Sequence, residues 1–146
     1  MIVKKTHVGA YGVIINDGKI ALIRKARGGY KGKLDLPGGG IEHEELPSEA
    51  LVREIREEID ATVEGYYLLD VTSVNITWEM EKDLLEDLHH VGILYRVSVL
   101  ETELKKDADG LDSEGASWYF IEDLKKSELS PFAIYSLEKL GYKLTD

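Results

Sequence analysis

The stretch of sequence that decides the fold runs from Leu36 to Ala61 and reads LPGGGIEHEELPSEALVREIREEIDA. A proline and three consecutive glycines follow Leu36, which is typical of a tight turn or a loop in close contact with a ligand. Pro47 suits the first turn of a helix, where its missing N–H costs no hydrogen bond. Apolar side chains then recur with helical periodicity in a stripe about 100° wide, namely Leu51, Val52, Ile55 and Ile59. The pattern predicts an amphipathic helix from Pro47 to Ile59 after a glycine-rich loop.

Three glutamates of this helix fall on a separate face, and they are Glu54, Glu57 and Glu58. Side chains three and four positions apart are neighbours on a helix, so each like-charged pair destabilises it by roughly 0.2–0.5 kcal/mol. Carboxylate oxygens gathered on one face are also the ligands that Mg²⁺ takes. Taken alone, the three glutamates are more typical of a solvated face that is ion-paired to neighbouring arginines. The surrounding sequence is therefore needed to distinguish a metal site from a solvated helix face.

The segments around the helix predict strands before and after it. The pattern is a mixed α/β one, with helices packed on a sheet, and no Pro/Ser-rich linker divides residues 1–146, so we expect a single domain. The expected elements are strands at Val8–Ile15, Lys19–Ile23 and Leu34–Leu36, one or two strands in Thr62–Thr77, a loop or short helix at Glu79–Leu88, a strand at His90–Leu100, a polar loop at Glu101–Gly115, a strand at Ser117–Ile121 and a closing helix at Pro131–Leu140.

Composition excludes several classes of protein. The chain has 146 residues and no cysteine, which excludes a disulfide framework, a thiolate zinc site, a cysteine nucleophile and an iron–sulfur cluster. Its 28 acidic against 18 basic residues give a net charge of −10, which disfavours long nucleic acids as partners. No apolar run approaches the roughly 18 residues of a membrane span, and no signal peptide is evident. We therefore expect a cytoplasmic protein without a membrane partner.

Positive charge is concentrated just before the glycine run. Between Gly18 and Leu34 the chain carries six cations and no acidic residue. A cationic patch of this kind suits an anionic substrate, and Arg24 and Arg27 are the candidate phosphate contacts. The alternative is a solvated loop.

The spacing of the glycine run and the helix resembles the Nudix box, Gly-x5-Glu-x7-Arg-Glu-U-x-Glu-Glu-x-Gly-U, where U is aliphatic. The resemblance extends from Gly39 to Ala61, and the strictly matching residues are Gly39, Glu45, Arg53, Glu54, Ile55, Glu57 and Glu58. The clear departure is Asp60, where the family usually has glycine. Aspartate tolerates the left-handed conformation expected after a helix better than most residues do. We therefore expect a modest cost in stability and an intact site.

The resemblance implies the fold and the reaction of the Nudix family. The fold would be an α/β/α sandwich with a mixed β-sheet between helices. The reaction would be hydrolysis of a nucleoside diphosphate linked to another moiety, with Mg²⁺ or Mn²⁺, and with water attacking a phosphorus of the diphosphate. The partner would therefore be a small nucleotide diphosphate, and a homodimer is one option because dimers are common in the family.

Roles carried over by box position give each matching residue a function. Glu57 and Glu58 would be the main metal ligands, and Glu54 a further ligand or the base that activates water. Glu45 would lie near the metal shell, and the Gly38 carbonyl is another candidate ligand. Arg53 would orient a glutamate through a charge-assisted hydrogen bond. Some relatives place the base in the loop before the last strand, where Glu114 is the candidate, with a solvated loop acid as the alternative.

Two other functions of the same fold are open to comparison. A non-catalytic nucleotide-sensing module would usually have a degraded box, whereas the acidic set is intact here. Isomerisation of an isoprenyl diphosphate uses a cysteine, and this chain has none. The substrate is not defined by the box, and its determinants are expected in Glu79–Leu88 and Glu101–Gly115. Aromatic and histidine side chains elsewhere are more simply structural, including Tyr11, Tyr30, Tyr66, Tyr67, Trp78, His43, His89 and His90.

Overall fold

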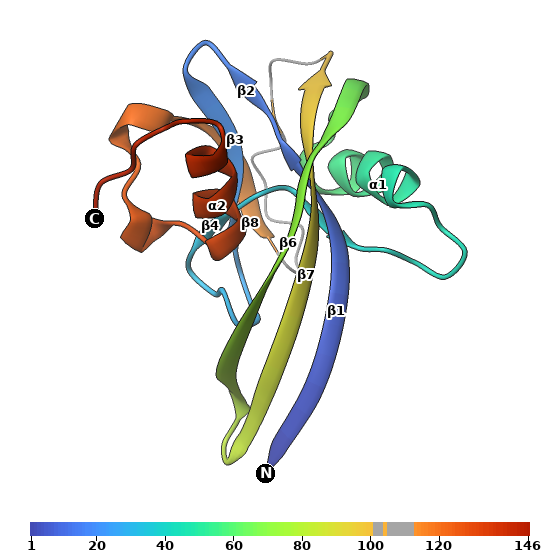
Figure 1. Cartoon of the computed structure of the whole chain (residues 1–146), viewed down its shortest axis with the longest axis vertical. Coiled ribbons are helices and arrows are strands. Elements are labelled where there is room, and N and C mark those ends of the chain that lie inside the picture. Colours follow the sequence, from blue (N-terminus) through green and yellow to red (C-terminus); the bar gives the residue numbers. More distant parts are fainter. Residues whose placement is uncertain (101–103, 105–112) are drawn as a thin grey trace.

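The computed structural model describes residues 1–100, 104 and 113–146 of the chain (Figure 1). Its helices and strands are β1 (Ile2–Val13), β2 (Ile15–Asn16), β3 (Lys19–Lys25), β4 (Leu34–Asp35), β5 (Gly38–Gly40), α1 (Pro47–Ile59), β6 (Val63–Glu81), β7 (Leu84–Val99), β8 (Ser113–Phe120) and α2 (Pro131–Lys139), with short 3₁₀ turns at Ile121–Asp123 and Lys126–Glu128.

The strands form two sheets that lie between the helices. One sheet has the order β5-β1-β7-β6, with β1 parallel to β7 and the other pairs antiparallel. The second has β3 between β4 and β8, with β2 joined to β3 as a hairpin. Helix α1 packs against β1 and β5, and α2 lies on the opposite side, next to β4 (Figure 1). The predicted α/β/α sandwich with a mixed sheet is confirmed.

Two hydrophobic cores fill the space between these layers. The first is centred on α1, whose Leu51, Ile55 and Ile59 are fully buried. The second is centred on α2, where Phe132 and Leu137 pack against β1, β3 and β4. The expected helix Pro47–Ile59 is therefore confirmed, but the apolar stripe is narrower than predicted. Val52 lies at its rim and is 44% exposed.

The helix α1 ends as the sequence predicts. Asp60 has φ 55° and ψ 42°, the left-handed conformation that glycine usually supplies at this position. Its N–H donates to the Arg56 carbonyl at 3.1 Å, and its carboxylate accepts a hydrogen bond from the Arg56 guanidinium, also at 3.1 Å. These two bonds hold the end of the helix in place although glycine is absent.

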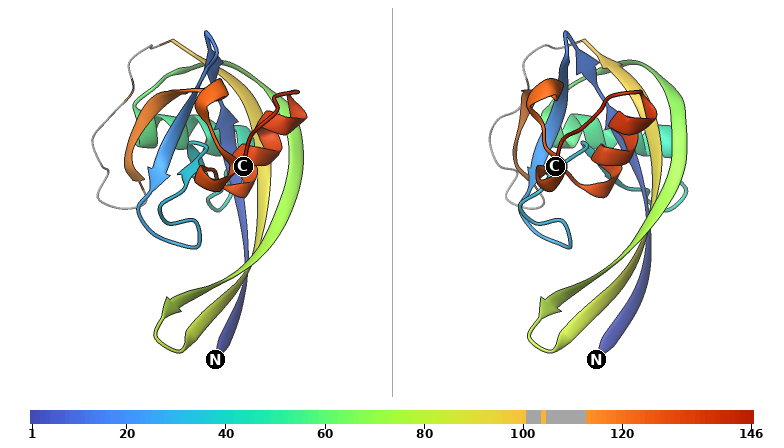
Figure 2. Two further views of the ribbon diagram at one scale, coloured as in Figure 1. Left: turned by 90° about the vertical axis from the view of Figure 1, so that its left-hand side faces the viewer. Right: turned by 60° about the vertical axis from the view of Figure 1, so that its left-hand side comes forward.

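The segment Glu79–Leu88, expected to be a loop or short helix, is instead a β-hairpin. Strand β6 continues to Glu81 and β7 begins at Leu84, with Lys82 and Asp83 as the two-residue turn. The start of β1 pairs in parallel with β7, from Ile2 opposite Leu85 onward. Residues 2–8, 74–81 and 84–90 together project from the body as a three-stranded extension, here called the arm (Figures 1 and 2). Acidic residues suggested a loop, but backbone pairing with two neighbouring strands outweighs their low strand propensity.

The remaining elements differ from prediction mainly at their ends. Strand β8 begins at Ser113 and ends at Phe120, so Ile121 belongs to the 3₁₀ turn that follows. Helix α2 ends at Lys139. Most of the polar loop expected at Glu101–Gly115 lies outside the described residues. Within the described part of the chain, no helix is both long and apolar enough to cross a membrane.

Candidate active site

The glycine run brings β5 and α1 into close contact. Strand β5 pairs antiparallel with β1, placing Gly39 opposite Ala10. A Cβ atom at Gly39 would lie 2.6 Å from the carboxylate carbon of Glu54, a distance that side chains do not tolerate. Only glycine at this position therefore lets the Glu54 carboxylate lie directly on the backbone of β5. Gly38 adopts φ 146°, which an L side chain rarely does.

Arg53 joins the loop to the helix. Its Nε and Nη2 donate to the two carboxylate oxygens of Glu45 at 2.8 and 2.9 Å, a bidentate pair. Nη1 donates to Glu54 Oε1 at 2.9 Å, and Nη2 also donates to the Gly40 carbonyl at 3.0 Å. Hydrogen bonds from Arg53, with a further one from the Glu42 N–H, lower the pKa of Glu45 to about 2. Arg53, predicted to orient a glutamate, therefore donates to Glu54 as well as to Glu45.

The three helix glutamates do not share one environment, contrary to the single acidic face expected. Glu58 is only 7% exposed, and its Oε1 accepts the Gly38 N–H at 3.1 Å. Burial raises the pKa of Glu58, and the nearby charges of Glu54 and Asp35 raise it further. The Glu57 side chain is 58% exposed and lies 3.3 Å from Arg53. Helical geometry explains the difference, because position 58 falls next to Leu51 on the buried side of α1, whereas position 57 falls about 100° further round the helix.

The chemistry of these donors fits a hard divalent cation. Mg²⁺ is usually held by one or two carboxylates, several waters and substrate phosphates. Glu54 and Glu58 supply such carboxylates beside the backbone of Gly38, and a cation would offset their mutual repulsion. Within the described residues, no group of three or more His, Cys, Asp or Glu side chains is arranged to hold a metal ion. Arg53 accounts for part of this, since it engages Glu45, Glu54 and Glu57 itself.

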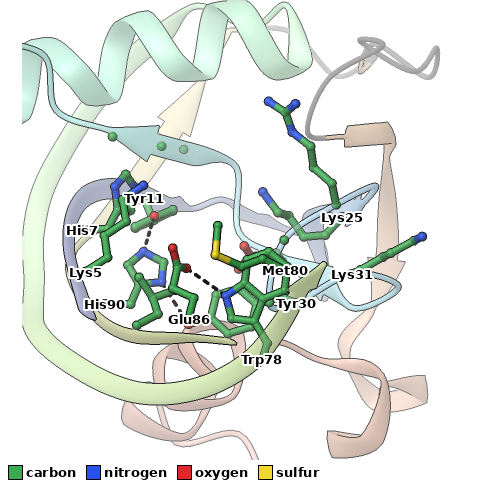
Figure 3. A pocket seen from close by; sticks show the side chains of 18 of the residues that line it. Lys5, His7, Tyr11, Lys25, Tyr30, Lys31, Trp78, Met80, Glu86 and His90 are labelled. Carbon is green, nitrogen blue, oxygen red and sulfur yellow. Dashed lines mark hydrogen bonds between the residues drawn. The ribbon is translucent and has the colours of Figure 1, made fainter. Parts of the chain in front are cut away.

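A cavity of about 840 Å³ opens from Glu54 and the glycine run (Figure 3). The loop after β3 and the concave face of the arm form its other walls. Besides Glu54, the lining residues are Lys5, His7, Tyr11, Lys25, Arg27–Lys31, Asp35, Gly38–Gly40, Trp78, Glu79, Met80, Glu86, Leu88 and His90. The segment Glu79–Leu88, expected to hold substrate determinants, therefore contributes directly to the cavity although its secondary structure was predicted wrongly.

Cations surround the cavity in part as predicted. Arg27 lines it, together with Lys25, Lys31 and Lys5, which the sequence did not single out. Arg24 is not among the lining residues, and its Nη1 donates to the Gly32 carbonyl at 2.9 Å. Arg24 therefore braces the loop that carries the other cations. The side chain of Glu114 lies outside the described part of the chain.

A histidine bonded to two tyrosines forms the floor of the cavity. The Tyr11 hydroxyl lies 2.6 Å from His90 Nε2, and the Tyr30 hydroxyl lies 2.9 Å from His90 Nδ1. Burial lowers the pKa of His90 to about 3, with the charges of His7 and Lys25 acting in the same direction. A neutral imidazole has one donor and one acceptor nitrogen, so one tyrosine donates to the ring and the other accepts from it. The structural interpretation of His90 agrees with this arrangement.

Sequence reasoning missed Lys5 and Glu86, and it counted Lys25 and Lys31 in the cationic patch without selecting them as phosphate contacts. The sequence offered no signal for the arm, because Leu84–His90 reads LLEDLHH and lacks the alternation of apolar and polar residues that marks a strand.

Comparisons with known proteins agree with this geometry. The chain matches the family model described as NUDIX domain over residues 5–140, and it belongs to that family. It is 34% identical over 119 residues to the ADP-ribose pyrophosphatase of Methanocaldococcus jannaschii, covering 82% of this chain and 64% of that protein. It is 38% identical over 63 residues to the 8-oxo-dGTP diphosphatase of Escherichia coli, covering 42% of this chain and 49% of that protein.

The fold is shared with solved structures. The crystal structure of a MutT NUDIX hydrolase from Burkholderia pseudomallei superposes with a TM-score of 0.76 at 26% identity, covering 93% of this chain and 98% of that one. The chain spans less than two thirds of the length of the archaeal pyrophosphatase that it resembles.

Proposed function

We propose that this protein is a metal-dependent pyrophosphohydrolase that cleaves a nucleoside diphosphate linked to another moiety. The observation that carries the proposal is a single cavity in which Glu54, seated on the glycine run, faces a group of cations. A diphosphate needs both parts, because the cations bind its charge and the carboxylates serve the attacking water. The names of the two curated relatives, a pyrophosphatase and a diphosphatase, support the same reaction class.

We assign Mg²⁺ or Mn²⁺ to this site as its cofactor. When bound, such an ion polarises a phosphoryl oxygen and lowers the pKa of water. Glu58 and Glu54 are the ligands that the geometry favours, with Gly38, Glu57 and Glu45 as further candidates. Glu45, Glu54 and Glu57 all contact Arg53, and a carboxylate in such a contact keeps lone pairs for a metal ion.

The chain's own groups then have separate tasks. Glu54 is placed to accept the proton of the attacking water, and Arg53 holds its carboxylate in position through the 2.9 Å hydrogen bond. Arg27, Lys25 and Lys31 bind the phosphates from the loop side of the cavity. Glu114 is the second candidate base.

The test is release of nucleoside monophosphate from a panel of nucleotides, ADP-ribose and nucleotide sugars at pH 8–9, with Mg²⁺, Mn²⁺ or EDTA. Glu54→Gln should lower kcat by about 10²- to 10⁴-fold, the usual contribution of a general base. Glu49→Gln is the matched control: Glu49 is in the same helix but outside the cavity, and the amide still accepts the Leu46 N–H. Nucleotide binding without turnover in the presence of metal would instead support a sensing module.

A further inference from the structure

Glu86 is a buried carboxylate at the arm end of the cavity. It lies in β7, is 6% exposed, and stands opposite Trp78 of β6 in the strand register. The indole Nε1 of Trp78 donates to Glu86 Oε1 at 2.9 Å (Figure 3). In the part of the chain that the structure describes, neither a lysine nor an arginine forms an ion pair with it. A buried carboxylate is stable only when donors surround it, and this bond engages one of its two oxygens.

The cavity therefore has two chemically different ends. Glu54 and the glycine run lie at one end, with Lys25, Arg27 and Lys31 on the loop beside them. At the other end, Glu86 lies between Trp78 and His90 and faces the cavity (Figure 3), and Glu79 and Lys5 of the arm also line it. A carboxylate repels phosphate and accepts hydrogen bonds from N–H groups. A nucleotide bound with its phosphates at the cationic end would place its base toward Glu86.

We propose that Glu86, held in position by Trp78, recognises the base of the nucleotide and favours guanine. An ionised carboxylate offers only acceptors, so it selects an edge that presents donors side by side. Guanine presents N1–H and the 2-amino group together. Hypoxanthine keeps N1–H but lacks the amino group, and adenine alternates an acceptor with a donor. The inference rests on the proposed function only in assuming that a nucleotide occupies this cavity.

The test is calorimetric titration of the full chain with GMP, IMP and AMP in the presence of Mg²⁺. None of the three contains a diphosphate, so binding is measured without turnover. We expect GMP to bind about tenfold or more tighter than AMP, the discrimination typical of a bidentate base contact, with IMP between them. Glu86→Gln should reduce the GMP-to-AMP ratio to within about threefold.

Asp87→Asn is the matched control, because Asp87 is the next residue of β7 and its side chain bonds to Asn75 on the outer face of the arm. The Asp87→Asn variant should show the same GMP-to-AMP affinity ratio as the unmodified protein. Trp78→Phe removes the indole donor and should lower the ratio less than Glu86→Gln does. It serves as the test if Glu86→Gln does not fold by circular dichroism.

Equal affinity for the three nucleotides, tighter binding of AMP, no binding, or an unchanged ratio in Glu86→Gln would each overturn the assignment. Guanine preference in a protein that hydrolyses no diphosphate would support Glu86 and contradict the proposed reaction. Hydrolysis of a diphosphate without any base preference would support the proposed reaction and contradict the role of Glu86.

Discussion

The segment Gly38–Ile59 and the arm meet in the same cavity, but they are built in different ways. In the first, the glycine run and the helix are neighbours in sequence, and one arginine joins them through contacts of 2.8 to 3.0 Å. In the arm, the hairpin of β6 and β7 pairs through its backbone with β1, which lies far away in sequence, and all three strands contribute side chains to the cavity. The first segment gathers charged side chains around one arginine, whereas the arm lines the cavity with side chains from three strands.

Among the substitutions that test this difference between the two regions, Gly39→Ala should have the largest effect on activity. The new Cβ would displace the Glu54 carboxylate, and a shift of about 1 Å in a reacting group costs roughly 100-fold in rate. We expect kcat/KM to fall by at least about that factor while thermal unfolding shows a folded protein. Gly65→Ala in β6 is the control, because its added Cβ approaches only Ser98 Oγ, at 3.3 Å. Full activity in Gly39→Ala would show that catalysis does not depend on the position of the Glu54 carboxylate.

Arg53→Lys tests whether the arginine acts through geometry or through charge. Lysine keeps the charge but cannot span Glu45, Glu54 and the Gly40 carbonyl with a planar fork. We expect kcat to fall by about 10- to 100-fold, the usual effect of losing a group that orients a metal-site ligand. Arg56→Lys at the exposed end of α1 should leave kcat unchanged. Steady-state kinetics of both variants distinguishes the two roles.

Because His90 is buried in the floor of the cavity, we expect the free energy of unfolding to depend on pH. Burial lowers the pKa of His90 from its ordinary 6.5 to about 3, so between these pH values the unfolded state binds more protons. The contribution of neutral His90 to the free energy of unfolding is complete above pH 6.5. It decreases as the pH falls, and the loss reaches about 2 kcal/mol at pH 5. Asp35 and Glu58 oppose this trend, because burial raises the pKa of both carboxyls.

The contribution of His90 can be isolated with His90→Gln. Denaturant unfolding between pH 5 and 7.5 should show a weaker acid loss in the variant than in the unmodified protein. Parallel pH curves for the two proteins would contradict a neutral, buried His90.

The smallest effect is expected from loss of the hydrogen bond between Tyr30 of the loop and His90 of β7. Tyr30→Phe removes the hydroxyl that lies 2.9 Å from His90 Nδ1. We expect a loss of about 1 kcal/mol in unfolding free energy, the net value of one hydrogen bond, and a raised KM with little change in kcat. Tyr135→Phe, which removes the partly buried hydroxyl bonded to Asp70, is the comparison for stability without a cavity effect. Equal KM values in both variants would mean that the loop does not need this anchor.

The sequence predicted the locally encoded region well and the arm poorly. Helix α1 and its left-handed end at Asp60 follow from spacing over a few residues, whereas the orienting role of Arg53 comes from the family resemblance and stays a prediction. The separation of Glu57 from Glu58 was already contained in the predicted apolar stripe, because position 58 lies next to Leu51 on the helix. The arm depends on pairing between Ile2 and Leu85, which no local pattern shows. Cytoplasmic location, a homodimeric state and the metal-binding roles stay predictions.

The parallel pairing of β1 with β7 also has a consequence for how the chain folds. Strands β6 and β7 are joined by two residues, so their hairpin closes a very short loop. β1 begins its pairing across most of the chain, and closing so long a loop costs more entropy and slows folding. We expect the hairpin to form first and β1 to dock onto it late. Pulsed hydrogen exchange should then show amides between β6 and β7 protected before those of residues 2–8.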